Sequence, residues 1–147
     1  MHIAYPAPVV VVDVANVMGA RADGWWRDRA GAALRLCTEV TALAGRSSGA
    51  GEAPAGAWVL VLEGRARDAA VLLQDEAGVD QAGGPVPVPV RVVSAPGSGD
   101  DAIVGVVAET VARDEGCLVV TADRELRQRC EELNASVVGP GWLLRLL

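Results

Sequence analysis

The sequence predicts an α/β fold: a three-layer α/β/α sandwich around a mainly parallel five-stranded sheet. Short valine-rich runs alternate with longer stretches in which apolar residues recur at helical spacing, and segments rich in Gly and Pro separate them. Strands that alternate with helices need right-handed crossover connections, which pair the strands in parallel. The chain has 147 residues, close to the usual size of one domain, so we expect a single domain over residues 1–147.

The first half of the chain supplies two strands and two helices. Pro8–Val12 is a continuous run of mostly β-branched residues, typical of a central strand that is buried on both faces. Apolar residues at helical spacing predict a helix over 26–44, followed by a surface connection over 45–57. Trp58–Leu62 is the second predicted strand. Asp68–Ala77 is a weakly predicted helix, with its first residue as the N-cap.

The second half repeats the alternation after a loop over Gly78–Pro89, in which alternating prolines rule out a central strand. The predicted strands are Val90–Val93, Cys117–Thr121 and Ala135–Val138. The predicted helices are Asp101–Asp114, which Gly116 ends, Arg124–Leu133, with Asn134 just after its end, and a short closing helix over Gly141–Leu147.

Composition excludes several kinds of chemistry. All 13 basic residues are arginine, which rules out a P-loop lysine, a Schiff base and the lysine of receiver-type phospho-acceptor sites. The single His2 leaves little for a zinc site or a histidine base. The net charge of −6 argues against broad electrostatic wrapping of nucleic acid, although a nuclease with metal-neutralised acids is compatible with it.

The cysteines and the apolar runs indicate a cytoplasmic protein. Cys37, Cys117 and Cys130 are odd in number, widely spaced and form no C-x-x-C pair, as expected of buried thiols in a reducing compartment. No apolar run approaches the roughly 18 residues of a membrane span. The N-terminus lacks the basic region of a signal peptide. We therefore expect cytoplasmic residence and no membrane partner.

Acidic residues follow four of the predicted strands: Asp13, Glu63, the pair Asp100 and Asp101, and Asp123. The carboxyl ends of neighbouring parallel strands meet at one edge of a sheet, where open α/β folds bind their ligands. Carboxylates gathered there repel one another and raise their pKa values unless a cation enters. Carboxylate oxygens suit Mg²⁺ or Mn²⁺. The pattern therefore predicts a divalent-metal site.

Each acid also has a simpler explanation. Asp123, Asp100 and Asp101 stand at predicted helix starts, where Asp is a frequent N-cap. Asp13 and Asn16 could form an Asx turn, and a solvated carboxylate such as Glu63 at a strand end needs no special reason. Capping and metal binding are compatible with each other, so the joint pattern decides in favour of the metal site.

Three segments resemble the acidic motifs of PIN-like nuclease domains, and in particular the NYN and YacP-like branch, whose first strand ends in Asp-x-x-Asn. They are Val11-Val12-Asp13-Val14-Ala15-Asn16, Ser98-Gly99-Asp100-Asp101-Ala102-Ile103 and Thr121-Ala122-Asp123-Arg124-Glu125-Leu126. The resemblance spans residues 8 to about 140. It implies a sheet of order 3-2-1-4-5 and Mg²⁺- or Mn²⁺-dependent cleavage of RNA.

The resemblance also implies roles for individual residues. Asp13, Asp100 and Asp123 would be catalytic metal ligands. Asn16 would orient a ligand or phosphate, Thr121 would support Asp123, and Asp101 would be a further ligand or a supporting group. Glu63 matches a position where NYN-like relatives often carry an acid. Many PIN domains place their second acid on the first helix, where this chain offers only Glu39, deep in the C-terminal half.

Arginines and tryptophans near these acids are candidates for substrate contact. Arg21 and Arg27 follow the Asp13 loop and Arg65 follows Glu63, so these residues could hold phosphates, with solvated surface charges as the simpler alternative. Of Trp25 and Trp26, we expect Trp26 to join the apolar stripe of the first helix. The other tryptophan would then be free to stack on an unpaired base.

These observations favour a metal-dependent ribonuclease acting on single-stranded RNA. Two alternatives stay open: an NTP pyrophosphohydrolase or other Mg²⁺-dependent nucleotide hydrolase, and a degenerate PIN-like module that binds RNA or a protein partner. The positive mean hydropathy, +0.29, leaves a homodimer open as well. A haloacid-type phosphatase is disfavoured because Val14 and Ala15 follow Asp13, and a Rossmann dehydrogenase because no G-x-G-x-x-G follows the first strand.

Overall fold

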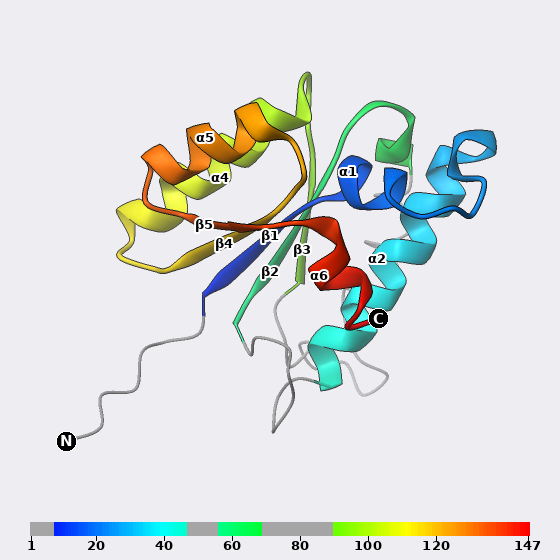
Figure 1. Cartoon of the computed structure of the whole chain (residues 1–147), viewed down its shortest axis with the longest axis horizontal. Helices are drawn as coiled ribbons and strands as arrows, with labels where there is room; N and C mark the ends of the chain where they lie inside the picture. The colour runs from blue at the N-terminus through cyan, green and yellow to red at the C-terminus, as the bar shows by residue number, and fades with distance from the viewer. Residues whose placement is uncertain (1–7, 47–55, 69–89) are drawn as a thin grey trace, which may run out of the picture.

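The computed structural model describes residues 8–46, 56–68 and 90–147, apart from the side chains of Arg46 and Arg65. Five parallel strands form one sheet of order β3-β2-β1-β4-β5 (Figure 1). The strands are β1 (Val9–Asp13), β2 (Trp58–Leu62), β3 (Val90–Ser94), β4 (Cys117–Val120) and β5 (Ser136–Val138). The predicted α/β fold and the sheet order are confirmed.

Helices cover both faces of the sheet (Figure 1). The helices α1, α2 and α6 lie on one face, and α4 and α5 lie on the other. The α-helices are α1 (Val14–Gly19), α2 (Arg29–Arg46), α4 (Gly99–Ala112), α5 (Arg124–Glu132) and α6 (Pro140–Leu144), and the 3₁₀ helices are η1 (Trp25–Arg27) and η2 (Gly64–Asp68). In the described residues, no helix is long and apolar enough to cross a membrane.

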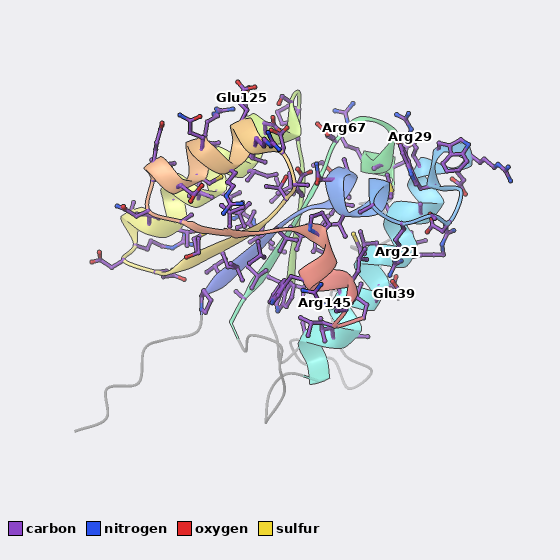
Figure 2. All side chains as sticks on the ribbon, viewed as in Figure 1. Arg21, Arg29, Glu39, Arg67, Glu125 and Arg145 are labelled. Atoms are coloured by element: carbon purple, nitrogen blue, oxygen red, sulfur yellow. The ribbon has the colours of Figure 1, made fainter. Side chains whose placement is uncertain are left out.

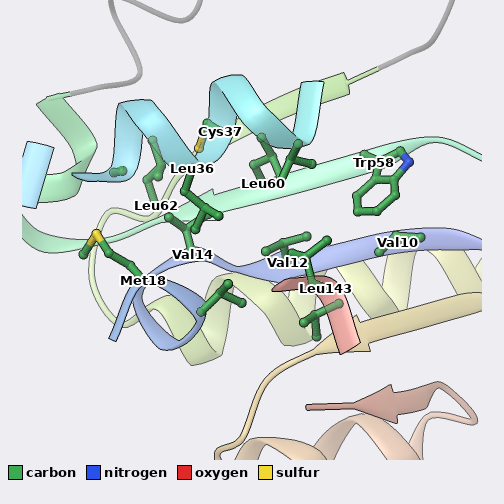
Figure 3. Packing of buried hydrophobic residues seen from close by; sticks show 14 of the residues in the cluster. Val10, Val12, Val14, Met18, Leu36, Cys37, Trp58, Leu60, Leu62 and Leu143 are labelled. Atoms are coloured by element: carbon green, nitrogen blue, oxygen red, sulfur yellow. The ribbon is translucent and has the colours of Figure 1, made fainter. Parts of the chain in front are cut away.

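The core explains why β1 is so uniformly apolar. Its side chains alternate between two clusters, with Val10 and Val12 facing α2 and α6, and Val9 and Val11 facing α4 and α5. Figure 3 shows the first cluster, in which Trp58 and the leucines of β2 pack beneath α2. All five residues of β1 are buried, so the polar residue that ends the strand is held rigidly.

The chain after β1 differs from the prediction. Helix α1 begins directly after Asp13 and was not predicted, because a run of six residues is too short to show helical periodicity. The long helix begins at Arg29, not at residue 26, because Asp28 precedes it with a non-helical backbone and accepts a hydrogen bond from the Gly31 N–H at 2.9 Å.

The expectation for Trp26 is wrong. Because the tryptophans lie in η1, which follows Gly24 at a φ of +77°, they are outside the stripe of α2. Trp25 packs against the core, whereas Trp26 is 57% exposed. The tryptophan that contacts the core is therefore Trp25, and the exposed one is Trp26, the reverse of the prediction.

Smaller differences occur at the helix starts. Ser98 is the N-cap of α4 and its hydroxyl accepts from the Asp100 N–H, so Asp100 and Asp101 lie in the first turn and do not cap it. Asp68 ends η2, and the rest of the predicted helix Asp68–Ala77, the loop Gly78–Pro89 and most of the connection 45–57 lie outside the described residues. Asn134 has the positive φ of +70° expected after a helix.

Candidate active site at the carboxyl edge of the sheet

Strand pairing places Asp13 beside Thr121. The central strand β1 is aligned with β4 so that Val12 faces Val120, and the next residue of each strand therefore lies at the same edge. The Thr121 hydroxyl donates to Asp13 Oδ2 at 2.9 Å, and both residues are buried. Asp13 Oδ1 accepts a longer bond, 3.4 Å, from the Asn16 N–H and caps α1.

The same hydroxyl connects Asp13 to Asp123. Thr121 Oγ1 accepts from the Asp123 N–H at 3.1 Å, so one side chain contacts both acidic residues. Asn16 adds a second link across this junction, since its Oδ1 accepts from the Ala122 N–H at 2.7 Å. The first and third acidic motifs are thus joined by hydrogen bonds although they lie more than a hundred residues apart.

Asp123 caps α5 with only one of its oxygens. Its Oδ1 accepts from the N–H groups of Glu125 at 2.9 Å and Leu126 at 3.1 Å. Oδ2 accepts no hydrogen bond from the described residues. Capping therefore fixes the orientation of this carboxylate and leaves one oxygen available to a ligand.

Glu63 joins the end of β2 to the start of α4. Its Oε2 accepts from the Gly99 N–H at 2.7 Å. A Cβ at residue 99 would lie only 2.8 Å from that oxygen, so a larger residue there would displace the Glu63 carboxylate. Sequence reasoning missed this role of Gly99; the available signal was a glycine placed directly before two acids at a helix start.

The carboxylates act on one another electrostatically. Burial raises the pKa of Asp13 to about 6, against the lowering effect of its bonds from Thr121 and Asn16, and the charges of Asp100 and Glu63 raise it further. Burial, followed by the charges of Asp123 and Glu63, raises the pKa of Asp100. Asp13, Glu63, Asp100 and Asp123 therefore form one mutually repelling group, which we call the acidic cluster.

Two other predicted site residues form ion pairs with helices outside the acidic cluster. Asp101 is exposed and pairs with Arg129 of α5 at 3.0 Å, and Arg21 pairs with Glu39 of α2. Arg27 lies over the Trp26 ring, with its guanidinium carbon 5.8 Å from the ring centroid. The side chain of Arg65 lies outside the described part of the chain.

The acidic cluster suits a hard cation in its donor atoms and its charge. The charges of Asp100 and Glu63 act on Asp13, and those of Asp123 and Glu63 act on Asp100. Asp100 accepts no hydrogen bond from the described residues and forms no ion pair with them. A bound cation would relieve the repulsion that, after burial, contributes to the raised pKa values of Asp13 and Asp100. Among residues 8–46, 56–68 and 90–147, however, no three Asp, Glu, His or Cys side chains are placed so that they could together hold one ion. Side-chain rotation is needed before several of them share a metal.

Comparisons with known proteins show the fold. No family model matches this chain, and no curated protein matches its sequence. The chain is similar to the crystal structure of a tryptophan-to-leucine variant of Rae1 (YacP) from Bacillus subtilis, with 15% identity and a TM-score of 0.60 over 93% of this chain and 72% of that one. That protein carries the name YacP, which is also the name of the branch that the three motifs resemble. The chain thus has the same α/β fold as that protein, with a parallel five-stranded sheet of order β3-β2-β1-β4-β5.

Proposed function

We propose that this protein is a metal-dependent ribonuclease that hydrolyses phosphodiester bonds of single-stranded RNA with Mg²⁺ or Mn²⁺. The observation that carries the proposal is the bridge of Thr121 between Asp13 and Asp123. It fixes two acids of the motifs at the carboxyl edge of a PIN-like sheet. The remaining acids of the cluster, Glu63 and Asp100, lie close enough to repel them.

Some of these residues would bind the metal, and others would hold the surrounding backbone in place. Asp13, Asp100 and Asp123 would hold the metal, and Glu63 would add negative charge while keeping α4 in place through Gly99. Thr121 and Asn16 position the loop that carries Asp123. A bound divalent ion would supply an activated water and neutralise charge on the scissile phosphate. Asp123 Oδ2 and both oxygens of Asp100 are the donors left without hydrogen-bond partners in the described residues.

The test is cleavage of labelled single-stranded RNA by the purified protein with Mn²⁺ or with EDTA. We expect cleavage only with Mn²⁺. Asp123→Asn should lower the rate by at least about a hundredfold, because an amide is a far weaker metal ligand than a carboxylate. Glu131→Gln is the matched control, since it removes one negative charge from an exposed position of the same helix.

A parallel reaction with an NTP mixture separates the alternatives. Pyrophosphate release without RNA cleavage would identify a nucleotide hydrolase and contradict the ribonuclease proposal. RNA binding without cleavage, under every metal tested, would identify a binding module in place of an enzyme.

A further inference from the structure

A hollow outside the acidic cluster lies between the start of α2 and the end of η2. Its volume is about 460 Å³. The lining residues are Trp26, Arg27, Asp28, Arg29, Ala30 and Asp68. None of the four carboxylates of the acidic cluster lines it, so the hollow is separate from the candidate metal site.

Trp26 presents an aromatic ring to this hollow. It is the large hydrophobic side chain that the described residues leave exposed, at 57%. Trp25 packs against the core and meets Trp26 nearly at right angles, with 6.0 Å between the ring centroids. The half-buried indole of Trp25 thus supports the exposed one, which favours an ordered ring that can stack on a ligand.

Two arginines of the hollow have no acidic partner in the described residues. Arg27 lies over Trp26, and Arg29 lies over Trp25 with its guanidinium carbon 5.5 Å from the ring centroid. Neither forms an ion pair with a described residue, although Asp28 and Asp68 line the same hollow. The described arginines that do form ion pairs are Arg21, Arg35, Arg113, Arg127 and Arg129.

The chemistry of the hollow fits a nucleotide. Unpaired guanidinium groups bind phosphate with several N–H donors, and an exposed indole stacks on a base only when that base is unpaired. Asp68 can accept hydrogen bonds from a base N–H or a ribose hydroxyl. The two carboxylates disfavour an anionic membrane surface, which offers acceptors and few donors.

The short helix η2 links a residue of the acidic cluster to a residue that lines the hollow. Glu63 directly precedes η2, and Asp68 ends it. Arg67 fixes the segment between them by donating to the carbonyls of Gly64 at 3.0 Å and Ala95 at 3.2 Å. In Figure 2, Arg29 and Arg67 lie on the same upper side of the molecule, beside η1 and η2.

We propose that this hollow is a subsite for one unpaired nucleotide of the RNA that the acidic cluster cleaves. In this subsite the base stacks on the face of Trp26 that Arg27 does not cover, and Arg27 and Arg29 bind the adjoining phosphates. The inference rests on the proposed ribonuclease function for its substrate, but binding can be measured without cleavage.

The test is the affinity for a short fluorescent oligouridylate in EDTA, which keeps the RNA intact. Trp26→Ala should weaken binding roughly tenfold, and Trp26→Phe should retain most of the affinity. Arg27→Gln and Arg29→Gln should each weaken binding several-fold and lower the salt dependence by about one released ion. Arg35→Gln is the control, because it removes an exposed charge of α2 that is already paired with Asp23.

The outcomes separate this proposal from the ribonuclease proposal. Equal affinity of the wild type and Trp26→Ala, with both proteins folded, overturns the subsite even when Asp123→Asn abolishes cleavage. Loss of affinity in Trp26→Ala supports the subsite even when the wild type cuts no RNA. A Trp26→Ala effect that is as large on duplex RNA also overturns it, because paired bases cannot stack there.

Discussion

At the scale of single residues, Asp13 is the group whose environment is most unusual. It is only 6% exposed, and burial raises its pKa from 3.8 to about 6. The sequence predicted that an acid stands at this strand end, since Asp13 follows four valines. It could not predict the Thr121 bond, because that contact depends on the register of two strands far apart in the chain.

The raised pKa predicts how stability changes with pH. The folded protein holds this proton more tightly than the unfolded chain, so the free energy of unfolding should fall as pH rises from about 4 to about 6 and then level off for this group. The contribution is roughly 3 kcal/mol, from about two pKa units at 1.36 kcal/mol each. In Asp13→Asn the free energy of unfolding should no longer fall over this pH range on account of residue 13. The variant should therefore be more stable than the wild type at pH 7. Urea unfolding across this pH range checks it, and identical pH profiles would contradict it.

The Thr121 hydroxyl should matter to both stability and activity. Thr121→Val keeps the shape of the side chain but removes the donor to Asp13 and the acceptor for the Asp123 N–H. We expect a loss of about 1 to 3 kcal/mol in unfolding free energy and a further rise in the pKa of Asp13. Thr121→Ser, which retains the hydroxyl, should recover most of both. A valine variant as stable as the wild type would show that the bridge is energetically neutral.

At the scale of elements, the strands were more predictable than the helix starts. Continuous apolar runs mark β1, β2 and β4 because both faces of a parallel sheet are buried. Helix starts depend on local backbone geometry. Because Gly24 has a positive φ and Asp28 caps the helix, α2 begins after both tryptophans. In α4 the N-cap is Ser98, where the sequence predicted Asp100.

The contact between Glu63 and Gly99 gives a prediction for α4. Gly99→Ala should push the Glu63 carboxylate away from the Gly99 N–H and cost about 1 kcal/mol or more. In a Glu63→Ala background the same substitution should become neutral or stabilising, because alanine favours the helix and nothing opposes its Cβ. A double-mutant cycle by urea unfolding measures this coupling. Additive effects would mean that the contact does not constrain residue 99.

At the scale of the whole molecule, the sheet order brings Asp13, Glu63 and Asp123 to one edge. The order β3-β2-β1-β4-β5 places the carboxyl ends of β1, β2 and β4 side by side. The resemblance to PIN-like domains implied this order, which periodicity alone could not predict. Periodicity finds strands but contains no information on which strands are neighbours. The positions of the side chains were less predictable, since Asp101 and Arg21 turn to partners on α5 and α2.

Manganese binding at neutral pH tests most directly whether the acidic cluster acts as one cation site. Titration of the protein with Mn²⁺, followed by the electron paramagnetic resonance of the free ion, measures the Kd. We predict saturable binding that Asp100→Asn weakens at least about tenfold, because a neutral amide replaces a carboxylate without partners in the described residues. Glu109→Gln, an exposed substitution on the same helix, should leave the Kd unchanged. Absence of Mn²⁺ binding in the wild type, or equal weakening by both substitutions, would contradict the account.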